Sequence, residues 1–266
     1  MNMMNIFARL KRSAKEVYDN RIILTALVRR NTAGRYKNSY VGFLWHLLLP
    51  VMMIVVLTIT FTYIKVRPIE NFWIYLSAAI FPVTFMSGCL RGRAIVTNSK
   101  YITKSNMPRE IVVIASVLTE FLTVVFAYLI IIMVILLSGQ YVNWYGFAMI
   151  PLELLLMLIF SLGCSFLVST ATVFVSDVGY FMSVAMRLVV WVTPTFFFVE
   201  DATGLLGIIV RYNPFTYFVE VFHDILYFGV FPHTSYLILS AIIAVATFLV
   251  GAIVFFHYER RFPEVL

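Results

Sequence analysis

The feature that most constrains this chain is a series of six long apolar runs, each of the length that crosses a bilayer as a helix. About 20 apolar residues are needed to span a hydrocarbon core of roughly 30 Å. The composition agrees, because 62% hydrophobic against 12% charged residues lies far outside the range of soluble domains. The sequence therefore predicts an all-α integral membrane protein with six transmembrane helices. The runs cover residues 40–64, 72–90, 111–137, 147–175, 178–199 and 236–256.

The basic residues are distributed very unevenly between the segments that connect these runs. With the N-terminus on the inner side, sixteen of the 20 Lys and Arg fall on that side, in residues 1–39, in residues 91–109 and after the last run. Cytoplasmic loops collect Lys and Arg, so we expect a multi-pass protein of the cytoplasmic membrane with both termini in the cytoplasm. The net charge of +7 is explained in this way, and no nucleic-acid partner is expected.

Residues 1–39 form a distinct segment before the first run. Apolar residues recur there at helical spacing, and basic residues fall largely off that stripe. Such a helix lies in the membrane interface, so we expect an amphipathic interface segment at 1–39 and a six-span transmembrane domain at 40–266. The basic residues fit anchoring to anionic headgroups and a docking role equally well. The apolar positions are Ile6, Leu10, Ala14 and Val17, and the basic ones are Arg9, Lys11, Arg12 and Lys15.

Two further segments are too long to be simple connectors. Residues 91–110 follow the second run and have room for a short helix that ends near Pro108. Residues 200–234 are apolar, but Gly and Pro divide them into two pieces too short to cross, and Asn213 with Pro214 is a good helix start. We expect a re-entrant helical pair there, which enters the outer leaflet and returns before the last span.

Few residues are candidates for chemistry. The four histidines have no partner at metal-ligand spacing, and no Gly-Lys pair occurs that could belong to a phosphate-binding P-loop. We therefore predict a chain that binds no metal or cofactor and is not an enzyme. Ionisable residues inside spans are costly and are functional candidates. They are Glu120, Glu153 and Arg187, of which Glu120 and Arg187 lie at depths that allow an ion pair.

Aromatic side chains gather toward the predicted outer face. An interfacial belt of Trp and Tyr accounts for most of them. Some fit a gate instead, because aromatic faces stack on sugar rings and seal a path, and Pro194 is expected to bend the fifth span beside them. The candidate gate or path-lining residues are Phe196, Phe197, Phe198, Tyr212 and Tyr217.

An ordered set of short motifs resembles one known family. The motifs are GRYKNSYVGFLWHLLLPV, KSNMPRE, VSDVG, WVTPTFFF, YNPFTYFVEVFHDILYFG and the tail RRFPEVL. Together they resemble the membrane subunit of type-two ATP-binding-cassette exporters. Within that group the chain is similar to the permeases for undecaprenyl-linked polysaccharides, namely O-antigen, capsule and wall teichoic acid. The resemblance covers essentially the whole chain.

The resemblance implies a homodimer that works with two copies of a separate ATPase, which binds the ATP and Mg. It also implies a coupling helix that contacts this ATPase and maps onto residues 98–109, and a re-entrant pair at 202–229. The chain departs from the pattern of many relatives at Ser176-Asp177, where they have Arg-Asp. The residues implied in coupling are Asn98, Asn106, Met107, Pro108 and Arg109.

The expected function is export of a lipid-linked polysaccharide by an ATP-driven permease. Gly34, Arg35 and Tyr36 are expected to receive the lipid-linked headgroup, because Arg forms bidentate contacts with phosphate, and lipid anchoring is the alternative for Arg35. Three other readings stay open: a type-two permease for a drug or small lipid, an ion-coupled transporter that uses Glu120, and a membrane-embedded transferase. The dispersed acidic residues of the outer loops disfavour the transferase.

Overall fold

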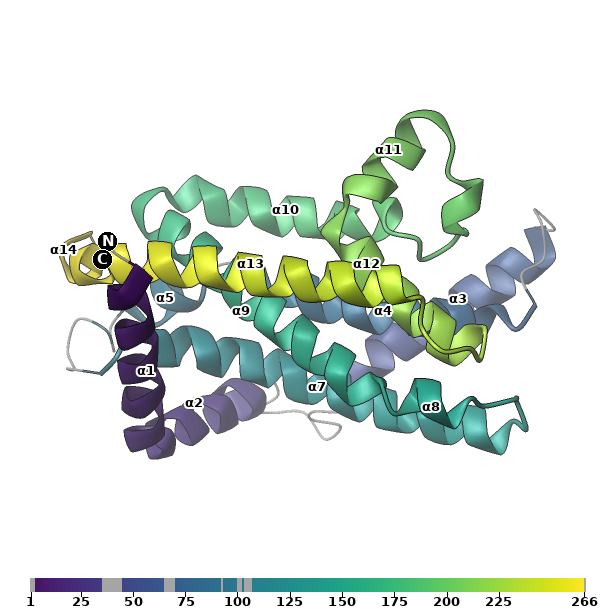
Figure 1. Cartoon of the computed structure of the whole chain (residues 1–266), viewed down its shortest axis with the longest axis horizontal. Coiled ribbons are helices and arrows are strands. Elements are labelled where there is room, and N and C mark those ends of the chain that lie inside the picture. Colours follow the sequence, from purple (N-terminus) through teal and green to yellow (C-terminus); the bar gives the residue numbers. More distant parts are fainter. Residues whose placement is uncertain are drawn as a thin grey trace.

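The computed structural model describes residues 3–34, 45–64, 70–91, 93–99, 102 and 107–265, and every regular element in these ranges is a helix. Four helical segments are long and apolar enough to cross a membrane. They are α4 (Phe72–Cys89), α7 (Glu110–Leu137), the segment Trp144–Phe174 and the segment Thr234–Val265. The last two contain α9 (Ile150–Phe174) and α13 (Thr234–Tyr258), and the four lie roughly side by side (Figure 1). The prediction of an all-α membrane protein is confirmed.

The centre of the bundle is α4, which packs against α7, α9 and three further helices and buries almost every residue. Hydroxyl groups tie its backbone to its neighbours. Tyr128 of α7 donates to the carbonyl of Ala78 (3.1 Å), and Ser165 of α9 donates to the carbonyl of Cys89 (2.8 Å). Because lipid offers no hydrogen bonds, such contacts satisfy polar groups inside the bundle.

Two helices flank this bundle at the places predicted for the first and fifth spans. Helix α3 (Trp45–Ile64) packs on α4, and α10 (Ser176–Val192) packs on α9 and α4. The prediction that the fifth span continues to residue 199 is wrong. Helix α10 ends at Val192 because Pro194 has no N–H to continue the hydrogen-bond ladder, and the chain makes a tight turn there in which Thr195 N–H donates to the carbonyl of Thr193.

The N-terminal segment consists of two helices, α1 (Met3–Asp19) and α2 (Arg21–Gly34). Helix α1 lies across one end of the bundle, at a steep angle to the long helices (Figure 1), and α2 packs on α7. The predicted apolar stripe is only partly right. Ala14 is exposed and Ser13 is buried, because α1 rests on charged groups at the end of the bundle.

Both predicted non-spanning segments contain short helices. The first holds the single turn α5 (Ala94–Thr97). The second holds α11 (Gly204–Tyr212), α12 (Pro214–Phe222) and the π-helical turn His223–Tyr227, which is labelled η3. Asn213 caps α12 as expected, by accepting from the N–H of Phe215 (3.0 Å). Helix α12 is buried against α13 and α4, whereas α11 lies on the surface and contacts α10.

Short elements complete the chain on either side of the last spans. The single turn α8 (Trp144–Phe147) precedes α9, and the 3-10 turn η2 (Val199–Asp201) precedes α11. After α13, the 3-10 turn η4 (Glu259–Arg261) leads into α14 (Phe262–Val265). The Phe262 side chain is fully buried against the rings of Phe255 (centroids 5.4 Å apart) and Phe174 (6.2 Å), so the C-terminal turn is packed onto the bundle.

Candidate functional site

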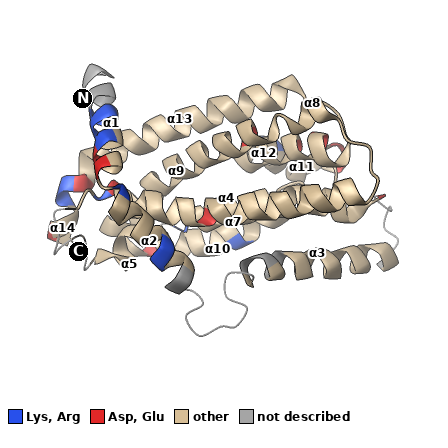
Figure 2. Ribbon diagram, turned by 90° about the horizontal axis from the view of Figure 1, so that it is seen from below, with Lys and Arg blue, Asp and Glu red and all other residues tan. Residues whose placement is uncertain are grey.

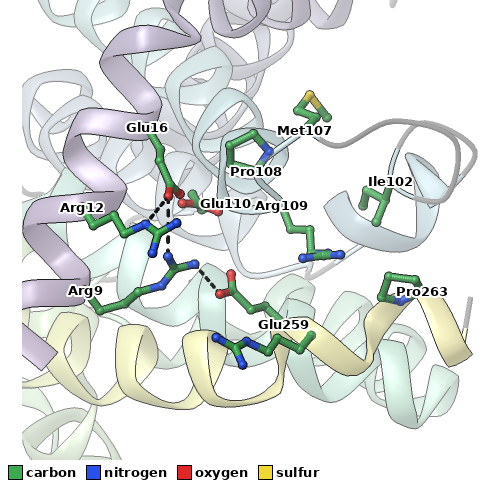
Figure 3. Close-up of a pocket in the computed structure, with 11 residues that line it drawn as sticks. Arg9, Arg12, Glu16, Ile102, Met107, Pro108, Arg109, Glu110, Glu259 and Pro263 are labelled. Carbon is green, nitrogen blue, oxygen red and sulfur yellow. Dashed lines mark hydrogen bonds and ion pairs between the residues drawn. The ribbon is translucent and has the colours of Figure 1, made fainter. Parts of the chain in front are cut away.

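Charged residues concentrate at the end of the bundle that carries α1 and α14, which we call the basic end (Figure 2). A cavity of about 520 Å³ opens there between α1, the segment before α7 and the C-terminal turns (Figure 3). Its walls therefore come from three distant parts of the chain. The lining residues are Arg9, Arg12, Glu16, Ile102, Met107, Pro108, Arg109, Glu110, Glu259, Arg260 and Pro263.

Helix α1 is fastened to this end by polar contacts rather than by an apolar stripe. Arg9 forms an ion pair with Glu259, which is only 4% exposed, and its guanidinium lies over the ring of Phe256 (5.1 Å). Ser13 Oγ donates to Glu110 Oε1 (2.9 Å) in a buried hydrogen bond. Removing one partner of a buried carboxylate is costly, so these contacts hold α1 against both α7 and the end of α13.

Each carboxylate that lines the cavity has a hydrogen-bond or ion-pair partner, whereas the lining arginines are only partly paired. Arg12 Nε donates to Glu16 Oε1 (2.7 Å), and Arg9 Nη1 lies 3.7 Å from the same oxygen. Arg260 is exposed, and the buried Nε atom of Arg109 has no hydrogen-bond partner within the part of the chain that the structure describes. The cavity can therefore accept an acidic group.

The structure gathers most of the predicted coupling residues at this cavity. Met107, Pro108 and Arg109 line its wall (Figure 3). Asn98 lies outside the cavity and links α5 to α2, because its Oδ1 accepts from Arg30 (2.5 Å) and its Nδ2 donates to the carbonyl of Ala94 (2.8 Å). Asn106 lies outside the described residues. The assignment of these residues to coupling stays a prediction.

The predicted headgroup residues are described only at their first member. Gly34 is the last residue of α2. Arg35 and Tyr36 lie outside the described residues, so the headgroup assignment also stays a prediction.

The predicted gate residues do not form one cluster. Phe196 stacks on Phe61 (6.1 Å, 3°), and Phe198 meets the ring of Tyr75 (5.0 Å). Tyr212 is 84% exposed on α11. The hydroxyl of Tyr217 donates to the carbonyl of Arg211 (2.6 Å). The rings of Phe196 and Phe198 thus meet different neighbours. The consecutive residues Phe196, Phe197 and Phe198, which we call the gate segment, make no ring contact with Tyr212 or Tyr217 within the part of the chain that the structure describes.

A buried polar cluster behind the gate segment escaped the sequence analysis. Tyr75 donates its hydroxyl to the carbonyl of Phe197 (2.6 Å), and its ring stacks on His223 (3.8 Å, 12°). Nδ1 of His223 lies 2.9 Å from Glu220 Oε1, and its Nε2 lies 3.1 Å from the carbonyl of Tyr75. Tyr75 thereby joins α4, the gate segment and η3. The spacing of Glu220 and His223 by three residues was the only sequence signal.

The connection from η3 to α13 is fixed by one carboxylate. Asp224 Oδ2 accepts from the backbone N–H of His233 (2.8 Å) and lies 2.8 Å from its Nδ1. This hydrogen bond raises the pKa of the exposed His233 imidazole, and the negative charge of Asp224 adds to the effect.

The three charges predicted inside spans have different surroundings. Glu120 of α7 lies beside Gly88 of α4, where a Cβ would meet its carboxyl group at 3.5 Å. Glu153 is fully buried in the first turn of α9 and accepts from Ser240 (3.3 Å). Arg187 is exposed on α10. The ion pairs among the described residues include none between Glu120 and Arg187, so the pairing that their depths allowed is not formed. No group of three or more metal-ligating side chains occurs in the described ranges.

Comparison with known proteins identifies the family of the chain. The chain is 23% identical to the O-antigen export system permease protein RfbA of Myxococcus xanthus over 95% of this chain and 98% of that protein. It is also 23% identical to a permease of the same name from Klebsiella pneumoniae, over 92% of this chain and 95% of the relative. Residues 23–227 match the family model described as ABC-2 type transporter. Permeases of this family pair with an ABC ATPase subunit, and they are transport components rather than enzymes. The chain belongs to the ABC-2 type transporter family, as a multi-pass membrane permease.

Proposed function

We propose that this chain is the permease subunit of an ATP-driven exporter, which moves a lipid-linked cell-surface polysaccharide across the cytoplasmic membrane. The observation that carries the proposal is the alignment with two permeases named for O-antigen export over more than nine-tenths of both chains. Capsule and teichoic acid belong to the same substrate class. An isolated shared domain would not support the substrate class in this way, because fold alone does not determine function.

The proposal includes a topology. Six helices cross the membrane when α3 and α10 are counted with the four long segments, and the basic end lies in the cytoplasm because of its Lys and Arg. Residues 1–39 form the interface segment, and residues 40–266 form the transmembrane domain with its re-entrant pair. Two copies of the chain assemble with two copies of the ATPase, which binds ATP and Mg.

The cavity at the basic end supports a coupling role in this assembly. It is bounded by α1, by the segment before α7 and by the turns after α13, so a force on Pro108 or Arg109 acts directly on the end of a spanning helix. Helix α1 is tied to two of these walls through Ser13 and Arg9. Movement of the ATPase against this surface would therefore shift α1, α7 and α13 together.

Family membership weighs against the ion-coupled and transferase alternatives, because ABC-2 permeases draw on an ATPase partner. Export of a drug or small lipid by the same mechanism is the remaining alternative. Depletion of the chain in its native host separates the two. We expect lipid-linked polysaccharide to accumulate on the inner side of the membrane and to disappear from the cell surface. Unchanged surface polysaccharide, together with accumulation of a small lipid or drug, would overturn the substrate class and leave the family assignment intact.

A further inference from the structure

Helix α10 carries an isolated charge in the middle of an apolar sequence. It follows α9 after the single residue Val175 and runs back alongside it (Figure 1). At 1.5 Å per residue, Arg187 lies about 15 Å from Asp177 in the first turn. This distance is about half of the ~30 Å hydrocarbon core, so Arg187 lies near the middle of the apolar layer that α9 crosses.

One face of α10 is turned away from the rest of the protomer. Gly179 and Val189 are buried, and a Cβ on Gly179 would lie only 2.8 Å from a methyl carbon of Thr172 in α9, so this side packs closely. Exposed residues recur every three or four positions on the other side. They are Tyr180, Phe181, Val184, Arg187, Leu188 and Trp191.

The exposed faces of α7 and α13 are different. In α7 the exposed residues from Leu122 to Leu137 are all apolar, and in α13 the same holds from Ile238 to Val250. Such faces suit contact with lipid. Arg187 makes no hydrogen bond or ion pair within the part of the chain that the structure describes. Charged side chains inside membranes face protein or a water-filled cavity, so the exposed face of α10 does not suit lipid.

A second cation extends this face toward the basic end. The guanidinium of Arg93, which is exposed, lies 4.9 Å from the centre of the Tyr180 ring. Arg93 and Arg187 thus mark the entrance and the middle of one surface, and Asp177 is the acidic residue near its entrance. Tyr180 and Trp191 lie on either side of Arg187 and offer ring faces on which sugars can stack.

In the proposed assembly the polymer passes between two copies of the chain, along a water-filled path that this face of α10 would line. We propose that Arg187 binds an anionic group of the lipid-linked polymer on this path. This inference rests on the proposed function. A guanidinium binds phosphate or carboxylate through two parallel hydrogen bonds, so the ligand is a phosphate of the lipid carrier or an anionic group of the polymer itself. Arg187 would favour polymers on a phosphate carrier in the first case and anionic polymers in the second.

The first test is water access, which does not depend on the substrate. The variants Val184→Cys and Leu188→Cys are prepared in native membranes. Each is then treated with a charged thiol reagent that does not cross the membrane. The matched controls are Leu129→Cys in α7 and Ile242→Cys in α13, which are also exposed, and the unmodified chain gives the background from its own cysteines. We expect labelling at the α10 positions only. Labelling there that is as slow as at the controls would overturn the proposal.

The second test is the charge of residue 187. Arg187→Gln should lower export of lipid-linked polymer about tenfold or more, since a charged hydrogen-bonded contact is lost, whereas Arg187→Lys should retain most of it. Arg211→Gln on α11 is the control. Co-purification of the ATPase checks assembly of each variant. Wild-type export by Arg187→Gln, or an equal loss with Arg187→Lys, would contradict the proposal.

Export of two different polymers by Arg187→Gln distinguishes the two possible sources of the anionic group, namely the lipid carrier and the polymer. If Arg187→Gln impairs a neutral glycan on a phosphate carrier as strongly as an anionic polymer, the contact is the carrier phosphate. If it impairs only the anionic polymer, the contact is in the polymer. If the wild-type chain exports no lipid-linked polymer, the proposed function fails, and the labelling test still decides whether α10 faces water.

Discussion

Helices α9 and α13 cross so closely that no side chain fits at their contact. A Cβ on Gly251 would lie 2.2 Å from the carbonyl oxygen of Gly163, and a Cβ on Gly163 would lie 2.5 Å from the Cα atom of Phe248. Both obstacles are backbone atoms, so no rotamer change relieves the clash and the helices must separate. Overpacking of this kind costs about 1–3 kcal/mol, which exceeds the ~0.5–1 kcal/mol gained from Gly→Ala within a helix.

We therefore predict that Gly251→Ala lowers the melting temperature of the purified complex in mild detergent. The fall should be about 2–4 °C for each kcal/mol of net destabilisation in a chain of this size. The matched control is Gly88→Ala in α4, where the nearest atoms to the new Cβ belong to the Glu120 side chain and begin at an ordinary 3.5 Å. We expect this variant to melt at the wild-type temperature or slightly above it.

A double variant tests the mechanism more strictly. Gly163→Ala and Gly251→Ala open the same crossing, so the loss for the double variant should be smaller than the sum of the two single losses. The reasoning would be refuted if Gly251→Ala had the melting temperature of the wild type. It would also be refuted if Gly88→Ala lowered the melting temperature as much as Gly251→Ala.

Three further predictions concern the polar contacts at the two ends of the bundle. Arg9→Glu places a second negative charge beside the buried Glu259 carboxylate, so α1 should detach and the N-terminus should become sensitive to protease. The additional change Glu259→Arg restores opposite charges and should restore protection. Tyr75→Phe keeps the stacked ring but leaves a backbone carbonyl of the gate segment without its donor, so the melting temperature should fall by the equivalent of about 1–2 kcal/mol, and an unchanged value would contradict the assigned hydrogen bond. Asp224 raises the pKa of His233, so the stability from this contact is complete below the ordinary histidine pKa and is lost as pH rises through the raised value. His233→Asn should accordingly lower the melting temperature at pH 6 more than at pH 9, and an equal effect at both would exclude the titration.

The spanning helices could be predicted from the sequence because their signal is local. A helix in lipid needs a long apolar run, and the run at 111–137 corresponds to α7 (Glu110–Leu137) within one residue. Local signals also placed the cap at Asn213. The end of α10 was misjudged because an apolar run continues past Pro194, and hydropathy does not register the missing N–H.

The contacts that build the site depend on distant residues, and periodicity does not reveal them. Arg9 and Glu259 are 250 positions apart, and Tyr75 and His223 are 148 positions apart. Ala14 is exposed because α1 packs on a charged surface. The spacing of apolar residues within α1 gives no information about that surface. The cavity also combines three segments, so only Met107, Pro108 and Arg109 were identified in advance, through a family resemblance.

The most direct test of the account is to purify the tagged chain from its native host in mild detergent, identify its stoichiometric partner and measure ATP hydrolysis. The account predicts a P-loop ATPase that co-purifies with the wild type and with Arg211→Glu, and that is lost with Arg109→Glu at the cavity wall. A chain that purifies alone, without ATP hydrolysis, and whose transport stops when the proton gradient is collapsed would contradict it.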